Sequence, residues 1–167
     1  MYVFISAGEA SGDWHGSHVV QALKEQRPNL RFFGLGGDRM AAQGVELLFH
    51  AKRLAFMGFA EVVRHLPYVM HVRRTVLHEI LERKPELIIL IDYPGLHFSL
   101  LRYLKSRQTV YKPRILYYIA PQVWAWKAAR GPNWLGWPTD CGDFSVRRED
   151  FSRFWRKRPV RGPSVAR

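Results

Sequence analysis

The chain has 167 residues, and 47% of them are hydrophobic, so it can bury the core of one domain and does not have the composition of a disordered protein. The single cysteine, Cys141, excludes a disulfide framework, and Glu9 and Asp13 lie where a signal peptide would need an apolar core. No apolar run is long enough to span a membrane, so we expect a cytosolic protein.

The net charge of +12 favours an anionic partner, namely nucleic acid, an anionic membrane surface or a phosphorylated substrate. The basic residues are spread along the chain and form no single nucleic-acid-binding stripe. A solvated basic surface accounts for the charge equally well.

The hydrophobic pattern alternates between strands and helices. Strands are expected at residues 2–5, 30–34, 45–49, 86–92 and 115–119. Helices are expected at residues 14–26, 38–44, 54–66, 68–83 and 99–107, with Pro67 separating the third from the fourth. Residues 87–91 are five consecutive aliphatics, as in a strand that is covered on both faces. The pattern therefore predicts an α/β domain with a doubly wound parallel sheet.

In such a sheet the segments that follow the strands meet at the carboxyl edge, where ligands bind. This places residues 8–13, 92–97 and 120–126 at one edge. The first segment, with Gly8 and Gly12, lacks the third glycine of a dinucleotide fingerprint and the lysine of a P-loop. Two interpretations remain open for it: a structural turn with Asp13 as a cap, or a turn whose acids Glu9 and Asp13 recognise ligand hydroxyls.

The other two segments are also open to two interpretations each. Asp92 emerges from the most apolar strand and could act as a general base, or it could cap the following helix. His97 could orient a substrate phosphate or cap a helix over residues 98–107. Trp124 and Trp126 could form a surface for a sugar or an acyl chain, or they could pack in the core.

Residues 54–70 are more apolar than an ordinary surface helix and are flanked by arginines. This pattern suits the interface of an anionic membrane or an acylated, phosphorylated ligand. The alternative is a pair of helices buried against the sheet. The residues expected to contact a membrane are Val62, Val63, Leu66, Val69 and Met70.

From Gly131 the pattern changes, because residues 131–167 are rich in Gly, Pro, Trp and Arg and contain no aliphatic run that could form another buried strand. We therefore expect one domain over residues 1–130, followed by an irregular basic tail over residues 131–167.

Five motifs occur together in one order. They are Ala7-Gly8-Glu9-Ala10-Ser11-Gly12-Asp13, Gly36-Gly37-Asp38-Arg39-Met40, Met57-Gly58-Phe59-Ala60-Glu61-Val62, Ile91-Asp92-Tyr93-Pro94-Gly95 and Ala120-Pro121-Gln122-Val123-Trp124-Ala125-Trp126. In this order they resemble the N-terminal half of the lipid-A-disaccharide synthase family, over about residues 1–130. Each motif is weak alone, and the set is specific.

The resemblance implies a two-domain GT-B glycosyltransferase whose N-terminal domain is Rossmann-like. Such an enzyme transfers diacylglucosamine from its UDP derivative to diacylglucosamine 1-phosphate, with inversion, at the cytoplasmic face of the inner membrane of a Gram-negative-type bacterium. No metal and no cofactor are expected, and nucleic acid is not an expected partner. The resemblance makes Asp92 the base that deprotonates the acceptor hydroxyl. The acceptor-binding residues that it implies are Gly8, Glu9, Ser11, Gly12, Asp13, His97, Gln122, Trp124 and Trp126.

The chain departs from the family pattern in two ways. Leu96-His97 stands where the family usually has Phe-Asn, and we expect the second domain, which holds most of the UDP-sugar site in this family, to be missing. We therefore expect a truncated or frame-shifted fragment that is inactive alone. The alternative function is a basic α/β binding module without catalysis, whose arginine-rich tail would grip nucleic acid.

Overall fold

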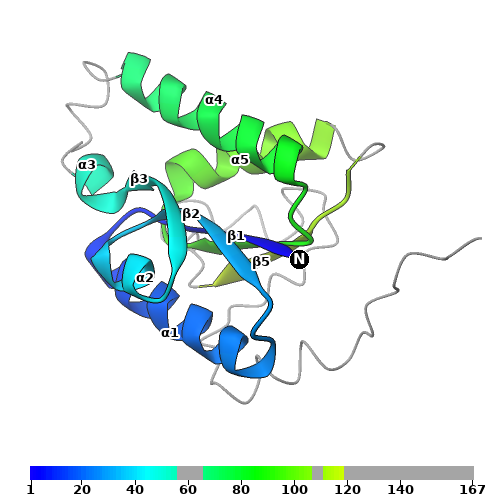
Figure 1. The fold of residues 1–167 in the computed structure, drawn as a ribbon. Coiled ribbons are helices and arrows are strands. Elements are labelled where there is room, and N and C mark those ends of the chain that lie inside the picture. The colour runs from blue at the N-terminus through cyan, green and yellow to red at the C-terminus, as the bar shows by residue number, and fades with distance from the viewer. Residues whose placement is uncertain (56–65, 107–110, 119–167) are drawn as a thin grey trace, which may run out of the picture.

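The computed structural model describes residues 1–55, 66–106 and 111–118, which form a central sheet between two layers of helices (Figure 1). The strands are β1 (Tyr2–Ala7), β2 (Arg31–Gly36), β3 (Val45–His50), β4 (Leu87–Ile91) and β5 (Arg114–Tyr118). The helices are α1 (Ala10–Gln26), α2 (Asp38–Ala42), α3 (Ala51–Ala55), α4 (Leu66–Arg83) and α5 (Pro94–Ser106). This alternation confirms the α/β prediction.

All strand pairs are parallel, and the order across the sheet is β3-β2-β1-β4-β5. The chain builds outward from β1 to β3 and then returns to the other side of β1 with β4. The strand order therefore reverses between β1 and β4, as in a Rossmann-like fold. Ala7, the last residue of β1, pairs with Ile91, the last residue of β4, so these two strands end level with each other.

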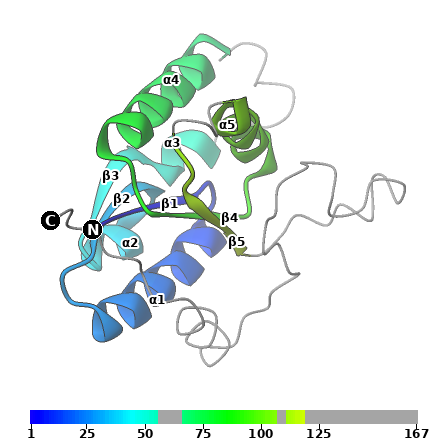
Figure 2. The same cartoon turned by 90° about the vertical axis from the view of Figure 1, so that its right-hand side faces the viewer.

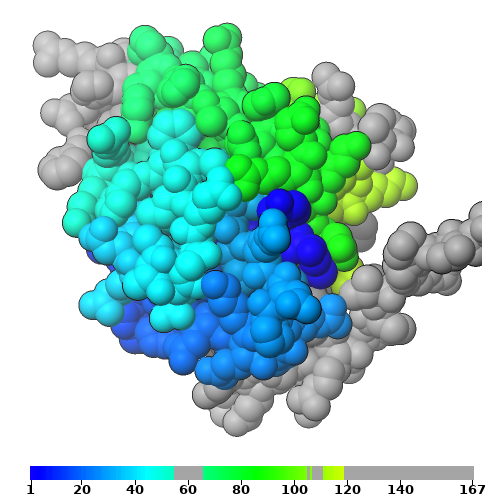
Figure 3. All heavy atoms as spheres, in the orientation of Figure 1, coloured from blue at the N-terminus to red at the C-terminus, as the bar shows by residue number. Residues whose placement is uncertain are grey.

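Each face of the sheet has its own apolar core, because successive side chains of a strand point to opposite faces. On one face, Val3 and Ile5 of β1 pack with the residues that α1 and α2 bury. On the other face, Phe4 lies in a cluster that includes the buried residues of α4 and α5. The two ribbon views show these layers on opposite sides of the sheet (Figures 1 and 2). In the space-filling view the N-terminal segment, in dark blue, lies directly beside the green segment that includes the C-terminal end of α4 (Figure 3).

The helix boundaries differ from the predicted ones at three places. α1 begins at Ala10 instead of residue 14, because Glu9 takes the N-cap position and its carbonyl accepts the first helical hydrogen bond, from the Asp13 amide. The described part of α4 begins at Leu66 and so includes Pro67, and a separation of two helices at this proline stays a prediction because the preceding residues lie outside the described ranges. α5 likewise begins at Pro94, five residues before the predicted start.

Two predictions lie largely or wholly outside the described residues. They are the tail at residues 131–167 and the helix at residues 54–66, of which residues 54 and 55 are described as the end of α3 and residue 66 as the start of the described part of α4. Within the described ranges, no helix combines the length and the apolar character needed to cross a membrane.

Candidate functional site

The ends of β1 and β4 bring two predicted site segments together. Because Ala7 and Ile91 are paired, Gly8 and Glu9 leave the sheet beside Asp92 and Tyr93. This is the point at which the strand order reverses, and open α/β sheets bind their ligands in the crevice there. The structure thus confirms that residues 8–9 and 92–93 share one edge, which we take as the candidate active site.

Gly8 and Tyr93 pack so closely that position 8 has no room for a side chain. A Cβ on Gly8 would lie 3.0 Å from the Cβ of Tyr93 and closer still to the Tyr93 ring. Tyr93 was not among the predicted site residues. The signal in the sequence was its position, because Tyr93 is an aromatic residue that follows Asp92 directly, just as Gly8 follows the neighbouring strand β1.

Asp92 has an unusual backbone conformation, with a φ of 32°, in the left-handed region that few residues other than glycine adopt. Asp and Asn tolerate this region better than other side chains do, and such residues are frequent at functional sites. The residue is half-buried, and no hydrogen bond or ion pair joins its carboxylate to another described residue. Tyr93 intervenes between it and the start of α5 at Pro94. The carboxylate therefore remains available for a ligand, and the helix-capping alternative gains no support.

Glu9 is exposed at the N-cap position of α1, two residues after the end of β1, and its side chain makes no capping hydrogen bond. Burial raises the pKa of the Tyr93 phenol, and electrostatic interactions with Tyr68 and with the Glu9 carboxylate raise it further. Tyr93 therefore keeps its proton at neutral pH and can donate a hydrogen bond. The site combines two carboxylates with a protonated phenol.

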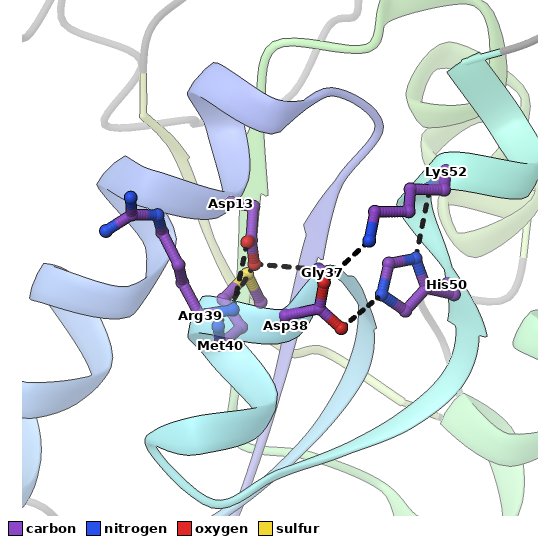
Figure 4. A network of polar contacts seen from close by, with 7 residues as sticks. All are labelled: Asp13, Gly37, Asp38, Arg39, Met40, His50 and Lys52. Atoms are coloured by element: carbon purple, nitrogen blue, oxygen red, sulfur yellow. Dashed lines mark hydrogen bonds and ion pairs between the residues drawn. The ribbon is translucent and has the colours of Figure 1, made fainter.

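Asp13 is buried and directs its carboxylate toward the start of α2 (Figure 4). Its Oδ1 accepts hydrogen bonds from the amides of Gly37, at 2.7 Å, and Met40, at 3.0 Å, while Oδ2 accepts one from Arg39 at 3.1 Å. The capping interpretation of Asp13 is thus observed, although the helix that it caps is α2. A contact between Asp13 and an acceptor stays a prediction.

A second polar cluster, at the ends of β2 and β3, was not predicted from the sequence. Asp38 binds Lys52 at 2.8 Å and the Nε2 atom of His50 at 3.1 Å (Figure 4). These hydrogen bonds, the one from Lys52 foremost, hold the pKa of the Asp38 carboxyl below its usual value. Asp38 and Lys52 are largely exposed, so the cluster joins α2 to α3 at the surface and is not a buried catalytic group.

His97 is fully buried, which neither interpretation of this residue predicted. Its Nε2 lies 2.8 Å from the Ser6 hydroxyl on β1, and its Nδ1 lies 3.2 Å from the Tyr117 hydroxyl on β5. Burial lowers its pKa to about 3, so the ring is neutral at physiological pH. The expectation that it caps a helix over residues 98–107 is wrong, because α5 already begins at Pro94. A contact with a substrate phosphate stays a prediction, and the buried ring gives it no support.

The remaining acceptor-binding residues fall into two groups. Ser11 is exposed in the first turn of α1, and Gly12 is buried where a Cβ would lie 3.0 Å from that of Ala7. Gln122, Trp124 and Trp126 lie outside the described residues. In the described part of the chain, no three His, Cys, Asp or Glu side chains are arranged to hold a metal ion.

The residues expected at a membrane are only partly described. Val62 and Val63 lie outside the described ranges, and Val69 is half-buried. Leu66 and Met70 are 52% and 39% exposed on the first turns of α4. Further along the same helix Val72, Val76 and Ile80 are buried. The alternative of a buried helix therefore holds for the later turns of α4 but not for its beginning.

Comparison with known proteins gives one consistent family. The family model for lipid-A-disaccharide synthetase matches residues 3–140. Lipid-A-disaccharide synthases from Acidobacterium capsulatum and Myxococcus xanthus are 46% and 41% identical over 77% of this chain. A relative of the same name from Neisseria meningitidis is 41% identical over the same share. The chain spans 31% of the length of the first of these relatives and 32% of the other two.

Proposed function

Since the chain belongs to the lipid-A-disaccharide synthase family, we propose that it supplies the acceptor-binding domain of a GT-B glycosyltransferase. The reaction is the inverting transfer of 2,3-diacylglucosamine from its UDP derivative to 2,3-diacylglucosamine 1-phosphate. It forms the lipid A disaccharide 1-phosphate and releases UDP. Most of the donor site would lie in a second domain, as the resemblance implies. The proposed boundary between this domain and the remaining residues stays near residue 130.

The observation that carries this proposal is Asp92 at the reversal of the strand order. Its carboxylate is half-buried, bound to no other described residue and next to the N-terminus of α1. In the proposed mechanism this carboxylate accepts the proton of the acceptor 6-hydroxyl as that oxygen attacks the sugar carbon of the donor. Glu9 and Tyr93 flank the acceptor sugar, where a carboxylate accepts hydrogen bonds from sugar hydroxyls and a phenol donates one.

The substitution Asp92→Asn tests the base. We would measure steady-state kinetics in a chimera that joins this chain to the remaining part of the Myxococcus xanthus relative. Loss of a general base should lower kcat by about 10²- to 10⁴-fold and leave the KM for the acceptor nearly unchanged. Asp38→Asn is the matched control, because this carboxylate lies beyond the end of β2 and is bound to Lys52. An Asp92→Asn chimera with the kcat of the parent would remove Asp92 from the base role.

We propose that the beginning of α4 contacts an anionic membrane at the cytoplasmic face of the inner membrane, where acylated substrates reside. Leu66 and Met70 form an exposed apolar patch, and Arg74 lies exposed one turn further along the helix. Apolar side chains beside a cation suit the interface of anionic lipids. The double substitution Leu66→Ser with Met70→Ser should therefore release the chain from vesicles that contain phosphatidylglycerol.

Trp14→Ser provides the control for sedimentation with these vesicles. Trp14 is 46% exposed, a fraction similar to those of Leu66 and Met70, but it belongs to α1 on the other face of the sheet. The control variant should sediment like the parent chain. Equal sedimentation of the double variant and the parent would show that the patch does not contact the membrane.

A further inference from the structure

Three elements of the fold meet at one buried imidazole. His97 belongs to the first turns of α5, and its two nitrogens contact Ser6 of β1 and Tyr117 of β5. Both His97 and Ser6 have no exposed surface. β1 and β5 lie on opposite sides of β4, so the imidazole joins the two strands that flank the strand that Asp92 follows.

The same histidine is connected to the residues that follow β4. The His97 amide donates a hydrogen bond of 3.2 Å to the carbonyl of Tyr93. The rings of His97 and Tyr93 meet edge to face with 5.9 Å between their centroids. Tyr93 in turn lies against Gly8. The left-handed backbone of Asp92 is thus followed by a residue that is held through both its carbonyl and its ring.

We propose that His97 is a positioning residue that, through its hydrogen bonds to Ser6 and Tyr117, fixes the turn after β4 and thereby the direction of the Asp92 carboxylate. This inference rests on the proposed function of Asp92 as the base. His97 itself touches no substrate in this proposal, because it has no exposed surface.

The geometry explains why an imidazole suits this place. A neutral imidazole has one nitrogen that donates and one that accepts, directed to opposite sides of the ring, and a hydroxyl can serve as the partner of either. Ser6 and Tyr117 present two hydroxyls from β1 and β5, the strands on either side of β4. Because a left-handed aspartate costs free energy, it persists only where its surroundings over-determine it. The link that His97 makes to Ser6 and Tyr117 provides such a constraint from within the buried part of the fold.

The test uses Ser6→Ala, which removes one partner of His97 and changes little volume. On the 167-residue chain, hydrogen exchange of the His97 amide should become about tenfold faster, because the bond to the Tyr93 carbonyl opens more often. In the chimera with the Myxococcus xanthus remainder, Ser6→Ala should lower kcat about tenfold and change the acceptor KM less than about twofold. Ser6→Thr keeps a hydroxyl and should restore both values.

The decisive measurement is the double variant Ser6→Ala with Asp92→Asn. If the link acts through Asp92, Ser6→Ala should cause no further loss of kcat once the base is gone. Tyr111→Phe is the control, because its hydroxyl donates to the carbonyl of Pro85, which precedes β4 and therefore lies at the opposite end of that strand from Asp92. It should leave both kcat and the exchange of the His97 amide unchanged.

The outcomes separate the two proposals. Losses that multiply in the double variant would overturn the positioning role, and so would a Ser6→Ala variant with the parent's kcat. An Asp92→Asn variant with full turnover would overturn the proposed base and the positioning role with it. A loss for Asp92→Asn combined with none for Ser6→Ala would leave the proposed function standing and remove only the inference about His97.

Discussion

The carboxylate of Asp13 on α1 accepts a hydrogen bond of 2.7 Å from the amide of Gly37, 24 residues further along the chain. Gly37 is required there, since a Cβ at this position would lie 2.6 Å from the Asp13 Oδ2 atom. The contact joins the first turn of α1 to the turn after β2. It therefore fixes the start of α1, which forms one wall of the candidate site.

Replacing Asp13 by asparagine should destabilise the domain. The amide group has one acceptor oxygen where the carboxylate has two, and its NH₂ would face the backbone amides that the carboxylate now binds. Because hydrogen bonds to a charged group contribute about 1.5–3 kcal/mol each, we expect a loss of about 2–4 kcal/mol in the free energy of unfolding. Urea denaturation followed by circular dichroism would measure it.

Glu9→Gln is the control for this experiment, because Glu9 is exposed and makes no capping hydrogen bond. Its unfolding free energy should stay within about 0.5 kcal/mol of the parent value. A similarly small change for Asp13→Asn would mean that the three amides find other acceptors, and that the Asp13 carboxylate does not hold α1 to α2.

The sheet could be predicted from the sequence, whereas the polar contacts of the site could not. The five consecutive aliphatics at residues 87–91 indicate a strand that is covered on both faces, so the existence of β4 and its place in a parallel sheet of an α/β domain follow from the hydrophobic pattern. Asp13 and His97 were both predicted to bind the acceptor. Their partners are separated from them by 24 and 91 residues, and no local pattern records such pairs. The polar Ser6 within a buried strand was the one available signal.

Gly8→Ala should disturb the candidate site through Tyr93. The added Cβ would lie 3.0 Å or less from Tyr93 side-chain atoms, so the Tyr93 side chain must move away from position 8. We expect the affinity for 2,3-diacylglucosamine 1-phosphate, measured by fluorescence titration in detergent, to fall about tenfold.

Gly95→Ala is the matched control for this substitution. Gly95 lies three residues beyond Asp92, but a Cβ there would meet no atom within 4 Å. Alanine also favours a helix by about 1 kcal/mol over glycine, so this variant should bind the acceptor normally and unfold at a slightly higher denaturant concentration. Equal affinities of the two variants would argue against the contribution of Tyr93 to binding.

Tyr68→Phe should stabilise the domain or leave its stability unchanged. The Tyr68 hydroxyl is buried, and it is the buried side-chain polar atom in the described residues for which no hydrogen-bond partner is found. Its removal avoids the cost of an unpaired buried hydroxyl, which is about 1–3 kcal/mol. Tyr111→Phe should instead lose about 1 kcal/mol, because the Tyr111 hydroxyl donates to the Pro85 carbonyl. Thermal unfolding of both variants would compare them, and a destabilised Tyr68→Phe would show that its hydroxyl has a partner.

His97 should make the stability of the domain depend on pH in the acidic range. Burial lowers its pKa from 6.5 to about 3 in the folded chain, so below pH 6.5 the unfolded chain binds a proton that the folded chain does not. Stability therefore falls as the pH is lowered from 6.5 toward 3, and at pH 5 the loss is about 2 kcal/mol. Urea denaturation at pH 7 and at pH 5 would measure this loss.

Carboxylates also contribute to the pH dependence in this range. The pH dependence of the parent chain should therefore be compared with that of His97→Gln, which has no titrating ring. The variant should lose less stability between the two pH values, whereas His78→Gln, at an exposed position of α4, should follow the parent. Parallel curves for the parent and His97→Gln would show that the ring is protonated as readily in the folded chain as in the unfolded one, which contradicts its burial between Ser6 and Tyr117.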